Sequence, residues 1–114
     1  MNKALIVLIL ATALVPLAAK GKDARCVVKQ NGDIAYSGSC EFIPDSGGSF
    51  GIRRKGNARI LPNITDISVF IVSPGVAEVR GLTTSGINSR WGTAVRSKKD
   101  TACWTGPDFE ICAY

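Results

Sequence analysis

The alternation of apolar and polar residues is clearest at the C-terminal end of the chain, in residues 101–114. Two short strand-forming runs flank the turn tripeptide Gly106-Pro107-Asp108. With Pro107 and Asp108 at the centre of the turn, Trp104 faces Ile111 and Cys103 faces Cys112. In that register one face of the hairpin is apolar and the other carries both cysteines. The pattern predicts a hairpin closed by a disulfide.

Upstream of this hairpin, short alternating runs separated by turn residues predict further strands. The most β-prone run is 66–73, which is apolar on both faces over 69–72, as expected of a central strand. The run 76–82 has Ala77 and Val79 inward, with charged residues between them. We also expect a weak strand at 58–61 and a polar loop at 83–90. The chain is therefore predicted to be all-β, with about eight short strands in an antiparallel meander that closes into a small barrel or sandwich.

The N-terminal pattern is different, because residues 4–19 form an apolar run interrupted only by Thr12. The run follows a short basic start and ends in small residues, which is typical of a secretory signal peptide. A membrane anchor is the alternative, but the run is shorter than the roughly 18 to 20 residues that span a bilayer. We expect residues 1–21 to be a signal peptide cleaved after Ala19 or Gly21, and residues 22–114 to form a single small domain without a membrane span. The expected location is periplasmic or secreted.

Four cysteines in an exported domain favour two disulfides over a metal site. Three pairings are possible, and Cys26 with Cys40 and Cys103 with Cys112 are preferred because each pair flanks a predicted turn. The first pair is harder to place, since a tight Asn31-Gly32 turn sets Cys26 opposite Ser37. A bulge at residues 37–39 is expected to bring Cys40 into reach.

Candidate chemistry is sparse. The chain contains no histidine, which excludes the common nucleophilic triads and the commonest metal ligand, so neither a metal nor a cofactor is expected. Most carboxylates lie in predicted turns or on outward faces, and nothing in the sequence places a serine and a lysine together in a pocket. A hydrolase using paired carboxylates or a Ser-Lys pair is therefore the least favoured hypothesis, and no catalytic residue is assigned.

Charge provides the candidate binding residues. Removing residues 1–21 takes Lys3 and Lys20 from the 14 basic residues, which leaves 12 against 9 acidic residues and a net charge of about +3. The basic residues cluster in two predicted turns, and Tyr114 is the expected exposed aromatic residue. The partner-binding candidates are Arg53, Arg54, Lys55, Arg59, Arg96, Lys98, Lys99 and Tyr114. They suit an anionic envelope component or an envelope protein, whereas the alternative is a pair of solvated turns; nucleic acid is not expected.

A family resemblance rests on both ends of the domain. The strings Tyr36-Ser37-Gly38-Ser39-Cys40-Glu41-Phe42, Ala102-Cys103-Trp104 and Ile111-Cys112-Ala113-Tyr114 resemble a group of small uncharacterised secreted proteins of Gram-negative bacteria. The resemblance implies a periplasmic, two-disulfide domain, but it implies no activity, because none is assigned to that group.

Three functions are weighed on these grounds. The first is an exported binding or inhibitor-type module of the bacterial envelope, which a cleft shared by Arg53, Arg54, Arg96 and Tyr114 would favour. The second is an envelope-associated structural or assembly protein without a discrete site, which an unpaired β edge at residues 67–72 would favour. The third is the hydrolase.

Overall fold

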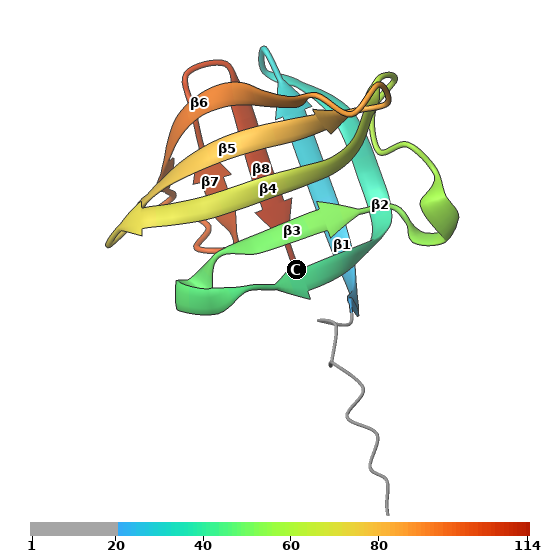
Figure 1. Cartoon of the computed structure of the whole chain (residues 1–114). Helices are drawn as coiled ribbons and strands as arrows, with labels where there is room; N and C mark the ends of the chain where they lie inside the picture. The colour runs from blue at the N-terminus through green and yellow to red at the C-terminus, as the bar shows by residue number, and fades with distance from the viewer. Residues whose placement is uncertain (1–20) are drawn as a thin grey trace, which may run out of the picture.

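The computed structural model describes residues 21–114, which form a closed antiparallel barrel of eight strands (Figure 1). Each strand pairs with the next along the chain, and β8 pairs with β1 to close the ring. The strands are β1 (Lys22–Gln30), β2 (Asp33–Pro44), β3 (Phe50–Arg53), β4 (Ile64–Ser73), β5 (Val76–Thr83), β6 (Asn88–Arg96), β7 (Cys103–Thr105) and β8 (Phe109–Ala113); short 3-10 turns η1 (Ser46–Gly48) and η2 (Lys55–Asn57) flank β3. The predicted fold class is confirmed, with a barrel rather than a sandwich. The predicted signal peptide lies in residues 1–20 and the adjoining Gly21, almost entirely outside the described residues.

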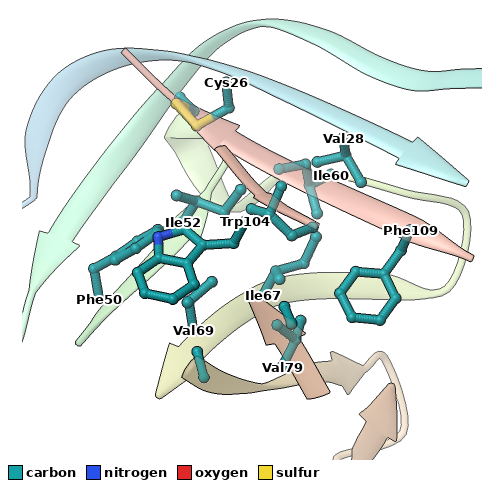
Figure 2. Packing of buried hydrophobic residues seen from close by; sticks show 14 of the residues in the cluster. Cys26, Val28, Phe50, Ile52, Ile60, Ile67, Val69, Val79, Trp104 and Phe109 are labelled. Carbon is teal, nitrogen blue, oxygen red and sulfur yellow. A yellow bond between two sulfur atoms is a disulfide. The ribbon is translucent and has the colours of Figure 1, made fainter. Parts of the chain in front are cut away.

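Strict alternation along the strands places one set of side chains inside the barrel. Ile52, Ile67, Val79 and Ile111 are fully buried, each on a different strand, and they pack into one core (Figure 2). In β5 the predicted inward positions, Ala77 and Val79, are both buried. Burial of these side chains supplies the main driving force for folding.

The C-terminal hairpin has the predicted register. Cys103 lies opposite Cys112 and Trp104 opposite Ile111, and the Gly106 N–H donates to the Phe109 carbonyl at 2.8 Å to close the turn. Trp104 and Ile111 point into the barrel, so the Cys103–Cys112 disulfide lies on its outer surface. Both predicted disulfides are present, and Cys26–Cys40 belongs to the interior core.

The bulge expected at residues 37–39 lies elsewhere. The β1–β2 register shifts between Val28 and Lys29, which leaves Ala35 as the extra residue. Cys26 then lies opposite Gly38 and Cys40 opposite Ala24, so the disulfide joins diagonal neighbours on the inner face, with Cα atoms 5.8 Å apart. Gly38 has a different role, since a Cβ there would come within 3.1 Å of the Tyr36 hydroxyl.

The expected strand at residues 58–61 is wrong. Leu61 forms only an isolated bridge with Ile64, and the N–H groups of Ile60 and Leu61 both donate to the Ile64 carbonyl. Instead of pairing, this segment places Ile60 and Leu61 in the core, where they are 3% and 4% exposed. The tight turn at residues 62–63 leaves no length for a ladder, so burial of the two side chains determines the conformation.

Two other expectations also need correction. The polar loop is shorter than 83–90, because β6 already begins at Asn88. Residues 69–72 are not covered on both faces, since Phe70 and Val72 are 62% and 59% exposed. A barrel buries only its inner face, and an apolar run on both faces therefore leaves its outer members in solvent.

Candidate binding site at the barrel mouth

The two ends of the barrel are built differently. At one end, here called the closed end, the segment between β3 and β4 adds Ile60 and Leu61 to the core. At the other end lie the turns 44–49, 73–76 and 97–102 together with the C-terminus, and we call this end the barrel mouth (Figure 1). The strand directions impose this division, because successive antiparallel strands turn at alternate ends.

A pocket of about 340 Å³ opens at the barrel mouth. Its lining is mainly apolar and comes from strands on several sides of the ring: Phe42, Phe50, Ile71, Ala102, Trp104 and Ala113. A barrel of eight strands has an interior that side chains fill or that holds one small ligand. Here the buried side chains fill the middle of the barrel and leave an apolar hollow at the mouth.

Closely packed aromatic rings form part of this lining. Phe42 and Phe50 stack with their ring centroids 4.8 Å apart and their planes at 24°. Trp104 is only 4% exposed and lies close to Phe50 in the interior (Figure 2). These rings are held by core packing, so the apolar wall of the pocket exists before any ligand arrives.

Of the residues that the structure describes, Arg96 is the only charged one that lines the pocket. It lies opposite Trp104 in the β6–β7 ladder, with its guanidinium carbon 5.6 Å from the centroid of the indole ring. Its Nε donates to the Thr101 carbonyl at 2.8 Å. Among residues 21–114, no carboxylate lies within 4.0 Å of the Arg96 side chain, whereas Glu78 binds both Arg80 and Arg90.

A second hollow of about 290 Å³ adjoins the first and shares Phe42 and Ala113 with it. Ala24 and Tyr114 complete its apolar side, and Lys22 and Asp23 stand at its edge. The mouth therefore offers a continuous apolar surface that runs from Trp104 towards the C-terminus.

The predicted basic residues do not form one surface. Arg53, Arg54, Lys55 and Arg59 lie on β3 or just after it, whereas Arg96, Lys98 and Lys99 lie at the β6–β7 connection. Strands β3 and β7 are four positions apart in a ring of eight, so the two clusters are on opposite walls. None of the pockets found in residues 21–114 brings Arg53, Arg54, Arg96 and Tyr114 together.

Most of the first cluster is engaged within the protein. Arg53 Nε lies 2.9 Å from Glu41, and this hydrogen bond raises the pKa of the guanidinium. Lys55 Nζ lies 2.6 Å from Asp23, and Arg54 stands 5.5 Å from the centroid of the Tyr36 ring. Arg53 and Lys55 are therefore paired within the protein, and Arg54 packs against an aromatic ring.

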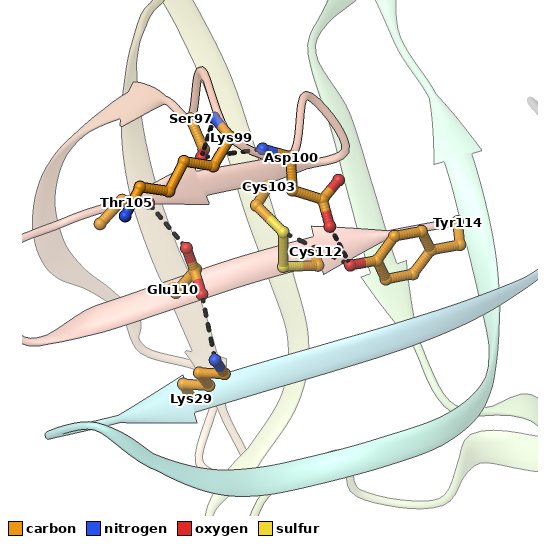
Figure 3. A network of polar contacts seen from close by, with 9 residues as sticks. All are labelled: Lys29, Ser97, Lys99, Asp100, Cys103, Thr105, Glu110, Cys112 and Tyr114. Carbon is orange, nitrogen blue, oxygen red and sulfur yellow. Dashed lines mark hydrogen bonds and ion pairs between the residues drawn. A yellow bond between two sulfur atoms is a disulfide. The ribbon is translucent and has the colours of Figure 1, made fainter.

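Tyr114 contacts the outer Cys103–Cys112 disulfide and is hydrogen-bonded to Asp100 (Figure 3). Its hydroxyl donates to Asp100 Oδ2 at 2.5 Å and lies 3.6 Å from Cys103 Sγ. The hydrogen bond from Tyr114, followed by one from the Ala102 N–H, lowers the pKa of Asp100. The same bond to Asp100, followed by desolvation, raises the pKa of Tyr114. Tyr114 is 54% exposed, yet its hydroxyl is hydrogen-bonded to Asp100 in the β6–β7 connection.

Residues 21–114 contain one grouping with metal-ligand residue types, and it has no free thiolates. Cys103, Glu110 and Cys112 place their side-chain ligand atoms within 4.8 Å of one another, but the two cysteines form a disulfide. Glu110 accepts a hydrogen bond from Thr105 at 2.8 Å and lies 3.6 Å from Lys29 Nζ. This grouping is a structural contact on the outer face of the hairpin.

The closed end carries a separate polar hollow of about 270 Å³, lined by Asn31, Arg90, Asp108 and the aromatic pair Trp91 and Phe109. The two rings meet edge to face at 5.7 Å. The two tryptophans of the chain thus lie at opposite ends of the barrel.

The residues of the mouth were not among the predicted site residues, apart from Arg96 in the pocket and Tyr114 in the adjoining hollow. Trp104 was expected on the apolar face of the hairpin, and it is buried. One sequence signal for the mouth was present in β6. Gly92, Ala94 and Arg96 are alternate residues on the same face of the strand, and the first two are buried. An arginine at the inward position that follows two small inward residues indicates where the interior meets solvent.

Comparison with protein-family models, with curated proteins and with solved structures finds no match for the chain. Within residues 21–114 no helix has the length and apolar character needed to cross a membrane.

Proposed function

We propose that this domain is an exported, non-catalytic binding module of the bacterial envelope, and that its binding site is the barrel mouth. The observation that carries the proposal is the hollow of about 340 Å³ with an apolar lining and one cation, Arg96, that has no carboxylate partner among residues 21–114. Ligand sites in proteins are typically concave, mostly apolar and equipped with a few polar groups that orient the ligand. Export is inferred from the N-terminal pattern and from the two disulfides.

The chemistry of the pockets supports binding over hydrolysis. The mouth pocket contains one guanidinium and one hydroxyl, from Arg96 and Thr101, and no carboxylate. Among the side chains of residues 21–114 that line the neighbouring hollow, the single carboxylate is Asp23, which is paired with Lys55. Glycoside hydrolysis generally requires two carboxyl groups facing one bond.

The assembly hypothesis depended on an unpaired edge at residues 67–72. Residues 67–69 pair with β3 on one side and with β5 on the other, so their backbone groups cannot accept an added strand. Phe70 and Ile71 pair with β5 alone, and the Ile71 N–H donates to Ser49 Oγ, which leaves only a short stretch of edge. An inhibitor-type role remains a form of the binding proposal, in which an apolar side chain of an envelope protein enters the mouth.

The test is affinity capture from envelope extract with the oxidised protein purified from the exported fraction of cells expressing the full chain. Ala113→Leu fills the mouth, and Ala35→Leu adds the same side chain at an exposed position of β2. We expect one envelope component to be retained by the wild type and by Ala35→Leu and lost from Ala113→Leu.

Thermal melts of each variant establish that the barrel is folded, and Ala102→Leu is a second mouth-filling variant if Ala113→Leu is unstable. Capture that is equal for wild type and both mouth-filling variants would show that the site lies elsewhere. Capture of nothing specific at low salt would contradict a binding function.

A further inference from the structure

We propose that the barrel mouth binds a single-chain anionic amphiphile, whose alkyl chain occupies the apolar pocket and whose carboxylate pairs with Arg96. The inference rests on the proposed binding function and specifies its ligand class.

The shape and lining of the pocket suit an alkyl chain. About 340 Å³ is at the small end of the range for ligand sites, which is roughly 300 to 1,000 Å³. The interior wall consists of Phe50, Ile71 and Trp104, which offer no hydrogen-bond partner to a polar ligand apart from the indole N–H. The part of a ligand that is buried against this wall must therefore be apolar.

Arg96 supplies the group that would hold a negative head. A guanidinium has five N–H donors in a planar fork that matches a carboxylate. The Nε donor is used by the Thr101 carbonyl, and no residue in the part of the chain described here accepts a hydrogen bond from the two terminal nitrogens. The indole ring of Trp104 and the Thr101 carbonyl hold the guanidinium at the rim, so its free donors are available without a large rearrangement.

The surroundings of Arg96 favour an anion. Lys98 and Lys99 follow it in the same connection, and Lys22 stands at the edge of the adjoining hollow. Of the acidic residues at this end, Asp100 binds Tyr114, Asp23 pairs with Lys55, and Asp45 accepts a hydrogen bond from the Ser46 N–H. The pocket therefore combines an apolar interior with the guanidinium of Arg96 at its rim, which complements a carboxylate on an alkyl chain and disfavours a cation.

Three probes with the same alkyl chain separate the contributions of the chain and the charge: octanoate, 1-octanol and octylamine. Titration into the ¹⁵N-labelled oxidised protein is followed on the two tryptophan indole N–H signals. Trp104 lies in the mouth, and Trp91 at the closed end is an internal control in the same spectrum. We expect octanoate to move the Trp104 signal in a saturable way, with the Trp91 signal unmoved, and to bind about fivefold more tightly than octanol, with octylamine the weakest.

Variants then assign the charge preference to one residue. Arg96→Gln should remove the preference for octanoate over octanol while leaving octanol binding unchanged, and Arg96→Lys should retain most of it. Arg59→Gln removes the same charge from an exposed arginine on the opposite wall and should change neither affinity. Ala113→Leu should weaken all three probes together.

The outcomes distinguish the two proposals. If octanol and octanoate bind equally at the mouth, the anionic specificity is overturned and the binding module stands. If no probe moves the Trp104 signal, the ligand class is overturned, and envelope capture alone decides whether the mouth instead receives a protein side chain. A preference for octanoate that persists in Arg96→Gln would also overturn the role given to Arg96.

Discussion

The closed end and the mouth of this barrel are stabilised in different ways. At the closed end Ile60 and Leu61 are buried in the core, and Phe109 packs edge to face with Trp91. At the mouth the interior is left partly empty, and covalent bonds hold the strands instead. The contrast indicates that a small barrel can leave one end open for a ligand if that end is cross-linked.

Both disulfides lie in the strands that frame the mouth. Cys103 and Cys112 join β7 to β8, each next to a lining alanine in the chain. Cys26 and Cys40 join β1 to β2, and Cys26 lies opposite the lining residue Ala113 in the β1–β8 ladder. The β6–β7 ladder has only two residue pairs, so the short strand β7 depends strongly on its disulfide to β8.

Removing both disulfides should have the largest effect on stability. Replacing all four cysteines with alanine releases loops with sequence separations of 14 and 9, each worth about 2 to 4 kcal/mol. A domain of this size has a total stability of roughly 5 to 15 kcal/mol, so we expect the variant to be largely unfolded near 37 °C. Urea unfolding followed by circular dichroism measures the change.

The two double variants locate the effect. Cys103→Ala with Cys112→Ala should loosen the mouth and weaken octanoate binding in addition to lowering stability. Cys26→Ala with Cys40→Ala also removes core contacts, because both sulfurs are inside. A four-alanine variant with the unfolding midpoint of the wild type would contradict the covalent account of the mouth.

Truncating one isoleucine at each end is the next strongest comparison. Ile60→Ala at the closed end leaves a cavity in tight packing and should lower the free energy of unfolding by about 2 to 4 kcal/mol. Ile71→Ala at the mouth removes a half-buried side chain that already borders open space, so the loss should be about 1 kcal/mol.

Ligand binding should respond in the opposite order. Ile60→Ala should leave octanoate affinity unchanged, while Ile71→Ala should alter it because the side chain lines the pocket. Urea titration and the Trp104 indole signal measure the two properties on the same samples. Equal destabilisation by the two truncations would show that the mouth is packed as tightly as the closed end.

Local pattern was enough to predict the strands and the C-terminal register. The equal spacing of Cys103 and Cys112 about the turn constrains one hairpin, so period-two alternation assigns Trp104 and Ile111 to the interior without further information. The same holds for Ala77 and Val79 in β5. The register of one hairpin and the inward face of one strand are each determined by residues close together in the sequence.

The mouth depends on contacts between distant strands, and local pattern does not contain them. Phe42, Ile71 and Ala113 meet only because the ring closes with a particular stagger, which no single hairpin determines. The bulge at Ala35 also depended on ring closure, since β1 must pair with β8 as well as with β2. A cleft shared by the two basic clusters would require two distant turns to meet, and the order of strands in the ring places these clusters on opposite walls.

The smallest expected effect concerns the outer wall of the mouth, where Tyr114 holds Asp100. Tyr114→Phe removes the hydrogen bond to Asp100 Oδ2 and should lower the melting temperature slightly at neutral pH. The pKa of Asp100 is lowered in the folded protein, so this contribution is present above the ordinary aspartate value, about 3.9, and is lost as pH falls through the lowered value.

The pKa of Tyr114 is raised, so its contribution is present below about 10 and is lost as pH rises through the raised value. The difference in melting temperature between wild type and Tyr114→Phe should therefore be greatest between about pH 5 and 9 and should shrink at both extremes. Tyr36→Phe is the matched control, since the Tyr36 hydroxyl donates to the Ser39 carbonyl, which does not titrate, and its effect should not shrink in acid. A Tyr114→Phe difference that stays constant down to acid pH would mean that the hydroxyl stabilises the outer wall through the disulfide contact rather than through Asp100.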